Sequence, residues 1–502
     1  MGKPSSYWDK RAARRLTDAE KQSEAYIKRI NKMYDQAERN IQREIDAIYR
    51  NYSKATGMDV QSLKTLLTKT ETDKLWNELK SKGLDKYVKG NYKARITRLE
   101  SLQAQIYAKA KEVYPKEQNA HTGLYKDVVG DTYYKGIYDA QMGTGYDFAF
   151  SRLDDDLVDK LLNERWSGAN YSQRIWGNTD LLAESLSEIV GGALLSGQSI
   201  AKTSRQIRER FDVAKYYADR LVRTETNHFH NEADAMAYEE MDVDKYVFLA
   251  VLDTRTSTIC QGLDNRAFPL KEREIGVNYP PMHPNCRSTT RAYMGAEVER
   301  TLQRRARDPI TGKNEVIGNM SYEEWYNDKV KQHGKRDVDA AYKMSANKTA
   351  DKKQYDKYVA RLGEKNVGTF DNFRKTKYNG DGSYGLLSRE YKTIGRINKY
   401  AESPEIAKRD IETYYRFRKD GVEMTNHGIY DYHLREYKKD GTRVYDYNKI
   451  VEIAKKEPNY YDGQTWRFVS VYDDICIVKE RGTNEVVSLR KGRVNKRWKK
   501  IL

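Results

Sequence analysis

The chain has 502 residues and a formal net charge of +17, with 38% hydrophobic and 33% charged residues. This length suits two or three domains, and the composition is typical of a soluble, helix-rich protein with modest cores. It argues against a membrane span, because no apolar run approaches 18 residues, and against a secreted disulfide framework, because there are 3 cysteines and no apolar signal segment.

Basic residues and tyrosines are both abundant. The chain has 91 Lys and Arg against 74 Asp and Glu, and 40 Tyr against 10 Phe. A basic surface with flat aromatic rings suits contact with nucleic acid or with acidic protein surfaces.

An amphipathic stripe runs through residues 16–52. Its apolar residues recur at spacings of three and four and are Ile27, Ile30, Tyr34, Ala37, Ile41, Ile45 and Ile48. This spacing predicts a long helix, which would form a helical arm over residues 1–130 with further helices at 60–82 and 87–114. We expect the arm to project and to bury its seam against another protein, with packing onto its own domain as the alternative.

Residues 131–300 are interpreted as a helical domain with a small β element. Helices are predicted over 203–211 and 213–238, and strands over 246–252 and 287–293. Within the second helix, Glu225 with Arg223 or His228 suggests acid/base chemistry, but charged residues beside a small sheet are more often an ion-paired scaffold.

Two of the three cysteines flank a loop that ends in P-P-M-H-P-N-C-R. Cys260 is followed by the H-x-x-C pair of His283 and Cys286, and a tight turn can aim imidazole and thiolate at one point. These three residues are candidate ligands of a zinc ion. Ser257 stands where the first cysteine of a C-x-x-C pair would be expected, so a fourth ligand is missing from the pattern.

Two roles without a metal remain open for Cys260 and Cys286. They fit equally well as small buried apolar residues, and less well as a disulfide in so cysteine-poor a chain. If a metal binds, Asp253, His228 or His230 could supply the fourth ligand.

A longer pattern surrounds the cluster. It comprises G-Q-S-I-A-K-T-S-R-Q-I at 197–207, Ala218, Val222, R-T-E-T-N at 223–227, Asp253, Arg255, Thr256, Cys260, Leu263, Asp264 and P-P-M-H-P-N-C-R at 280–287. In order and spacing it resembles the minor head proteins of tailed phages, the Mu F type of head-morphogenesis protein, over about Asp180 to Tyr293. Members of that family often carry the full C-x-x-C that Ser257 interrupts here.

The resemblance implies a phage minor capsid protein that lies near the portal inside the head and assists assembly or leaves with the DNA. Its implied partners are the portal protein, a major capsid or scaffolding protein, and nucleic acid. Its implied location is the virion, with the host cytoplasm during assembly. No enzyme activity is implied for this part of the chain.

The C-terminal third changes in character. Residues 301–395 are interpreted as a charged linker region with helices, and residues 396–502 as an α+β domain. In the latter, helices are expected at 403–415, 426–437 and 448–456, followed by strands at 465–472, 475–480 and 485–490. The fold class predicted for the whole chain is α+β and mostly α-helical, with the C-terminal helices packed on an antiparallel sheet.

This C-terminal order resembles the barnase, EndoU, colicin and RelE-like class of small ribonucleases. The resemblance implies metal-independent RNA cleavage, with His427 and His433 as acid and base and with Arg435 and either Arg490 or Arg493 beside the phosphate. Six residues apart on one helix, the two histidines would face about 120° away from each other. A capping role for His427, and RNA binding without cleavage, are therefore alternatives. A phage-borne ribonuclease effector is the alternative to the structural role.

Overall fold

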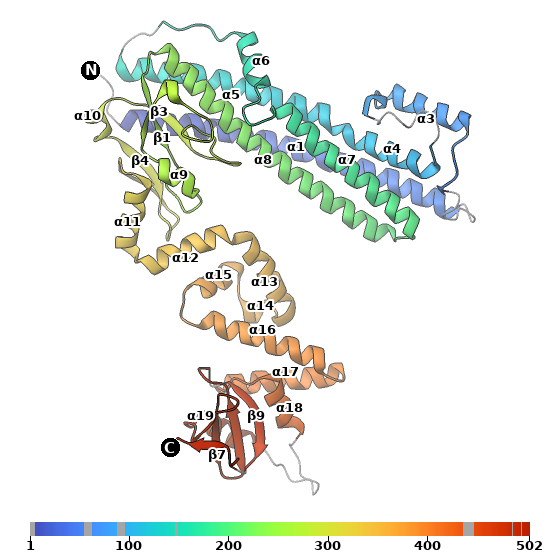
Figure 1. Cartoon of the computed structure of the whole chain (residues 1–502), viewed down its shortest axis with the longest axis vertical. Helices are drawn as coiled ribbons and strands as arrows, with labels where there is room; N and C mark the ends of the chain where they lie inside the picture. The colour runs from blue at the N-terminus through green and yellow to red at the C-terminus, as the bar shows by residue number, and fades with distance from the viewer. Residues whose placement is uncertain are drawn as a thin grey trace. The chain divides into compact units, whose positions relative to one another are not determined.

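The computed structural model describes residues 6–54, 63–87, 96–145, 149–434, 446–483, 485–492 and 494–501. The chain divides into two compact units, Met1–Gly334 and Lys335–Leu502. Helices dominate both units, and the strands form small antiparallel sheets (Figure 1). The predicted mostly helical α+β fold is confirmed. No helix in the described ranges is long and apolar enough to cross a membrane.

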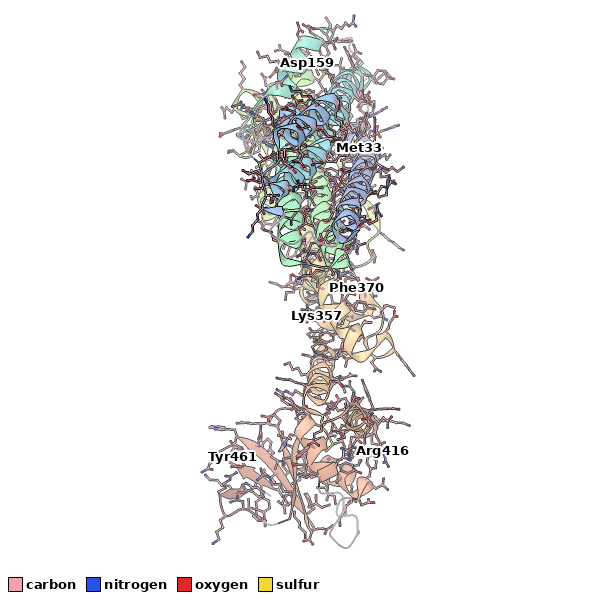
Figure 2. The ribbon with its side chains drawn as sticks, turned by 90° about the vertical axis from the view of Figure 1, so that its right-hand side faces the viewer. Met33, Asp159, Lys357, Phe370, Arg416 and Tyr461 are labelled. Carbon is pink, nitrogen blue, oxygen red and sulfur yellow. The ribbon has the colours of Figure 1, made fainter. Side chains whose placement is uncertain are left out.

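Long helices build most of the first unit. They are α1 (Ser6–Lys54), α3 (Lys69–Ser81), α4 (Arg98–Lys111), α5 (Val113–Thr144), α6 (Asp155–Asn163), α7 (Tyr171–Ser196) and α8 (Ile200–Glu240), with a 3-10 turn at Asp85–Tyr87. Helix α1 packs against α5 and α8, and α7 packs against α4 and α8 (Figure 1). Figure 2 shows the same bundle from the side, with Met33 on α1 and Asp159 on α6. The two helices predicted at 203–211 and 213–238 are one helix, α8, because neither Gly nor Pro interrupts them.

The apolar seam of α1 is covered by the chain itself. Ile30, Tyr34 and Ile41 are fully buried. They share one core with residues of α5, α7 and α8, among them Leu124 and Leu186. The expectation that this arm projects and needs a partner protein to cover its seam is therefore wrong. Periodicity located the buried face correctly, but the residues that cover it lie far away in the sequence.

A three-stranded antiparallel sheet of order β2-β1-β3 completes the centre of the first unit. The sheet consists of β1 (Lys245–Leu249), β2 (Ala267–Pro269) and β3 (Thr289–Ala292). The other elements of this region are α9 (Thr258–Leu263), a 3-10 turn at Leu270–Glu272, α10 (Ala296–Glu299), the separate hairpin of β4 (Gln303–Arg307) and β5 (Asn314–Gly318), and α11 (Tyr322–His333). Strand β3 packs against α1 and α8. Arg304 fixes the β4–β5 hairpin to the end of α9, because its guanidinium donates to both Asp264 oxygens at 2.8 Å.

The second unit begins with helices and ends with strands. The elements are α12 (Lys335–Ala346), α13 (Lys348–Leu362), α14 (Glu364–Val367), α15 (Phe370–Tyr378), α16 (Ser383–Tyr400), α17 (Pro404–Lys419), α18 (Asn426–Leu434), α19 (Tyr447–Lys455), β6 (Tyr460–Asp462), β7 (Arg467–Tyr472), β8 (Ile475–Lys479), β9 (Val486–Lys491) and β10 (Trp498–Lys500). The strands form an antiparallel sheet of order β10-β6-β7-β8-β9.

Helices α13, α16, α17, α18 and α19 share one apolar core with strands β8 and β9. Arg416 on α17 and Tyr461 on β6 mark the helical and the sheet parts (Figure 2). The predicted helices packed on an antiparallel sheet of at least three strands are confirmed. Residues 301–395, interpreted from their charge as a linker region, are divided between the two units, and both Trp325 and Phe373 in them are fully buried.

Three histidines are sealed inside the first unit. Burial lowers the pKa of His121, His228 and His230 to about 3. His228 stacks on Trp166 with ring centroids 4.6 Å apart, and neither of its ring nitrogens has a hydrogen-bond partner among the residues that the structure describes. These rings are therefore neutral in the folded protein and protonate only when it unfolds.

We predict that His228→Phe makes the first unit less sensitive to acid. The unfolded chain binds a proton on this histidine below its ordinary pKa of about 6.5, whereas the folded chain does not. The stabilising effect of a neutral His228 is thus present above that pH and is lost as the pH falls toward the folded pKa of about 3. As the pH falls from 6 to 4, the free energy of unfolding of the variant should rise relative to that of the unmodified protein by about 1.4 kcal/mol per pH unit.

Chemical denaturation at a series of pH values measures this difference. His427→Phe is the matched control, because the His427 side chain is 58% exposed. Parallel pH profiles for His228→Phe and the unmodified protein would contradict the prediction.

Candidate metal centre

Cys260 is held by a short capped helix. It lies in α9, and the hydroxyl of Ser257 accepts a hydrogen bond from the Cys260 backbone N–H at 3.3 Å. Serine is a preferred N-cap residue because its oxygen satisfies a free amide of the first turn. The residue that interrupts the C-x-x-C pattern therefore has a structural role, which is to fix the helix that carries Cys260.

His283 and Cys286 lie on one tight turn. The Cys286 N–H donates to the His283 carbonyl at 3.1 Å, and Asn285 between them has a φ of 58°. Asparagine tolerates this left-handed backbone better than most residues. Nδ1 of His283 lies 2.9 Å from the Pro284 carbonyl, which can only accept, so Nδ1 carries the proton and Nε2 keeps its lone pair.

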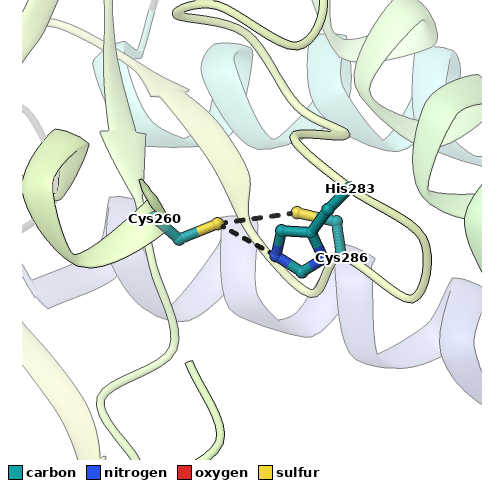
Figure 3. Close-up of side chains that lie close together, drawn as sticks. All are labelled: Cys260, His283 and Cys286. Carbon is teal, nitrogen blue, oxygen red and sulfur yellow. Dashed lines mark hydrogen bonds between the residues drawn. The ribbon is translucent and has the colours of Figure 1, made fainter. Parts of the chain in front are cut away.

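The three side chains converge on one point, as Figure 3 shows. The Sγ atom of Cys260 lies 3.5 Å from Nε2 of His283 and 3.9 Å from Sγ of Cys286. All three ligand atoms lie within 4.8 Å of one another. Tetrahedral zinc, with bonds of about 2.3 Å to sulfur and about 2.0 Å to nitrogen, places such atoms about 3.5 to 3.8 Å apart. The predicted convergence of Cys260, His283 and Cys286 is confirmed, and the two separations from Cys260 are close to those around a zinc ion.

The two thiols share a hydrogen bond that separates their acidities. The contact with Cys286 lowers the pKa of Cys260, and hydrogen bonds from Ser257 and Ser288 act in the same direction. The same contact, together with burial, raises the pKa of Cys286. The pair thus loses its first proton easily and retains the second. A divalent cation would change this, because it binds both sulfurs as thiolates.

None of the three suggested fourth ligands joins the group. The guanidinium of Arg287 donates to both Asp253 oxygens at 2.8 Å, and His230 lies between Thr132 and Thr289 at 3.0 and 3.2 Å. His228 stacks on Trp166 instead. Within the described ranges, no other His, Cys, Asp or Glu joins the three ligand atoms. A metal here would have three protein ligands and one open position.

Cys260 and Cys286 lie in an apolar setting without being bonded to each other. Both are free thiols, so the structure contains no disulfide between them. Both are buried in a small core with Phe248, Ala250 and Met282. Burial alone suits the apolar interpretation, but it does not account for the imidazole nitrogen placed beside the two sulfurs.

The charged residues of the R-T-E-T-N segment form the ion-paired scaffold that the sequence favoured. Buried Glu225 accepts from the Trp166 indole at 2.9 Å and pairs with Arg174, and burial raises its pKa. Arg223 donates to Glu24 of α1 at 3.0 and 2.9 Å. These contacts join α8 to α7 and α1.

The candidate catalytic residues of the second unit do not all come together. His427 lies 3.6 Å from Asp431, whose Oδ2 accepts from Ser488 at 2.6 Å on β9. His433 faces α17 instead, 2.9 Å from the Thr413 hydroxyl and 3.6 Å from Asp410. The two histidines thus contact different elements.

The structure describes Arg490 but not Arg435. Arg490 is exposed on β9, two residues beyond Ser488, so both side chains leave the same face of the strand. Arg435 and Arg493 lie outside the described residues. No sequence pattern indicated the Asp431–Ser488 contact, because it joins residues that are distant along the chain.

Comparison with known proteins supports the central resemblance. The model of a family described as Phage Mu protein F like protein matches residues 184–291, which contain α8, the β1 strand and all three residues of the cluster. The NAD(+)--arginine ADP-ribosyltransferase EFV of Enterococcus faecalis (strain ATCC 700802 / V583) is 25% identical over 254 residues, which are 47% of this chain and 50% of that protein. The chain therefore spans about half the length of this curated relative.

No solved structure matches the chain. The family match covers the segment in which the residue pattern resembles the Mu F type of head-morphogenesis protein, and it supports that assignment for residues 184–291.

Proposed function

We propose that the protein is a minor component of a tailed-phage head, that it lies at the portal vertex or on the inner capsid surface, and that it assists head assembly. The family match at residues 184–291 carries this proposal. The net charge of +17 suits a protein that is enclosed with packaged DNA. Portal protein and a major capsid or scaffolding protein are the proposed protein partners. Half of the E. faecalis relative lies outside the match, so the activity in its name does not by itself extend to this chain.

Purified particles from cells that produce the phage test this role. We expect mass spectrometry to find the protein in a fixed, low ratio to the portal protein through successive density-gradient steps. A host cytosolic protein provides the control, because its ratio to portal should fall at each step. If this protein is lost in the same way as the control, it is not a head component.

We further propose that Cys260, His283 and Cys286 hold one zinc ion that fixes the loops around β1. The support is the fit of their separations to tetrahedral zinc and the free lone pair of His283. Such an ion would join α9 to the His283–Cys286 turn. It would add a structural crosslink to the ion pair of Asp253 and Arg287, which already joins the loop before α9 to the end of this turn.

We predict about one equivalent of zinc per chain, measured by elemental analysis after dialysis. Cys260→Ser, Cys286→Ser and His283→Ala should each lower the bound zinc at least tenfold, because two ligands hold the ion poorly. Cys476→Ser is the matched control, because Cys476 is a buried free cysteine of β8 in the other unit. Full zinc content in Cys260→Ser, or its loss in Cys476→Ser, would refute the site.

A second candidate function belongs to the second unit. We propose RNA cleavage there, with the head-protein unit as its carrier. Two placements favour it. Exposed His427 lies beside Asp431, and Asp431 accepts a hydrogen bond from Ser488 of β9. Arg490 leaves the same face of β9 as Ser488. A carboxylate beside an imidazole orients it as a general base, and a guanidinium offsets phosphate charge. In this arrangement His433, held against α17, positions the helix instead of reacting.

We predict that His427→Ala lowers the rate of RNA cleavage by the full-length protein at least a hundredfold, the usual contribution of a general base. His433→Ala should keep the rate per folded molecule, although it loses contacts to Thr413 and Asp410. Circular dichroism measures the folded fraction of both variants. Equal loss in both variants, or no cleavage by the unmodified protein, would contradict this assignment.

A further inference from the structure

An open cavity of about 1010 Å³ lies between α1 and α8, beside the candidate metal centre. Its walls include residues of the R-T-E-T-N segment and of the stretch from Arg255 to Arg287. Arg223 and Thr226 of the R-T-E-T-N segment form one wall, and Arg255 with Arg287 forms another. Helix α1 supplies most of the rest, and Asn285 and Cys286 place the cavity next to the candidate zinc ligands. The proposed head-assembly role does not account for the cations of this cavity.

Positive charge dominates the walls. Five lining residues are Lys or Arg and two are carboxylates, Glu20 and Glu24. Glu24 pairs with Arg223. Asp253 serves two arginines, since it accepts from Arg287 at 2.8 Å and lies 3.5 Å from Arg255. The carboxylates are fewer than the cations they face, so a net positive charge is left for an incoming anion.

Arg255 is the most available of these cations. Its side chain is 62% exposed, and the bidentate partner of Asp253 is Arg287. A guanidinium held at one edge by a carboxylate still presents its other N–H groups, in the planar fork that matches phosphate oxygens.

Helix α8 contributes to one wall through Arg223 and Thr226. Thr226 lies three residues after Arg223, so both side chains face the same side of the helix. Thr226 is only 2% exposed and its hydroxyl is buried, so of these two residues it is Arg223 that offers a polar group to a ligand.

We propose that this cavity binds a phosphate group of a single-stranded nucleic acid backbone. Arginine guanidinium groups are among the groups that proteins use for phosphate. The volume lies at the upper end of that of small-ligand pockets and admits a nucleotide. The net charge of +17 draws a polyanion to the surface in preference to a small anion. The proposal stands independently of the head-assembly role.

Fluorescence anisotropy with a labelled single-stranded DNA oligonucleotide tests it on the full-length protein. The double variant Arg223→Gln/Arg255→Gln should weaken binding at least tenfold and lower the slope of log K against log salt by about 0.7, the value for one phosphate contact. The control is Arg208→Gln/Arg210→Gln, which changes the net charge equally at exposed positions of the same helix. Its binding should weaken less than threefold.

A variant with little effect on folding and a second ligand complete the test. Arg255→Lys keeps the charge of this exposed side chain but loses its planar fork, and it should weaken oligonucleotide binding severalfold. Inorganic phosphate should displace the oligonucleotide from the unmodified protein. Equal losses in the two double variants, or unchanged binding in Arg255→Lys, would overturn the cavity as the site. Binding of inorganic phosphate without oligonucleotide binding would overturn the nucleic acid as its source.

Discussion

A buried arginine holds the first unit together. Arg15 of α1 donates to Asp139 of α5 at 2.8 Å and to Asp234 of α8 at 3.1 Å. Burial raises the pKa of Asp234 to about 6, and Arg15 opposes that rise. His230 lies 3.5 Å from Asp234 and reaches Thr289 of β3. Removing one member of such a group leaves an uncompensated buried charge, so α1 is an integral part of this unit.

Helix α8 also holds the candidate metal centre in place. Its Thr224 hydroxyl accepts from the Asn285 N–H at 3.0 Å, and its Asn227 amide donates to the Ser288 carbonyl at 2.8 Å. These bonds hold the turn of His283 and Cys286 on both sides. The ligand geometry therefore depends on a helix that itself contributes no ligand. The same helix supplies Arg223 to the basic cavity, so one element positions both candidate sites.

The two units differ in the kind of chemistry that they can support. In the first, buried ion pairs and a cysteine and histidine cluster favour a rigid scaffold. The second has its own apolar core and sheet, with an exposed imidazole beside a fixed carboxylate. A chain of this kind can combine a structural role with a separate activity, because each of the two cores is formed by residues of its own unit.

The sequence alone determined the features that depend on near neighbours. The spacing of Ile30, Tyr34 and Ile41 marked a buried helix face, and the H-x-x-C turn with Cys260 marked the ligand set. Only the tertiary structure decided what meets across the chain. It covered the α1 seam with α5, α7 and α8, paired Asp253 with Arg287 and separated His427 from His433. Periodicity reports which face of an element is apolar. Which faces meet depends on packing between residues that are far apart in sequence, and no local pattern records it.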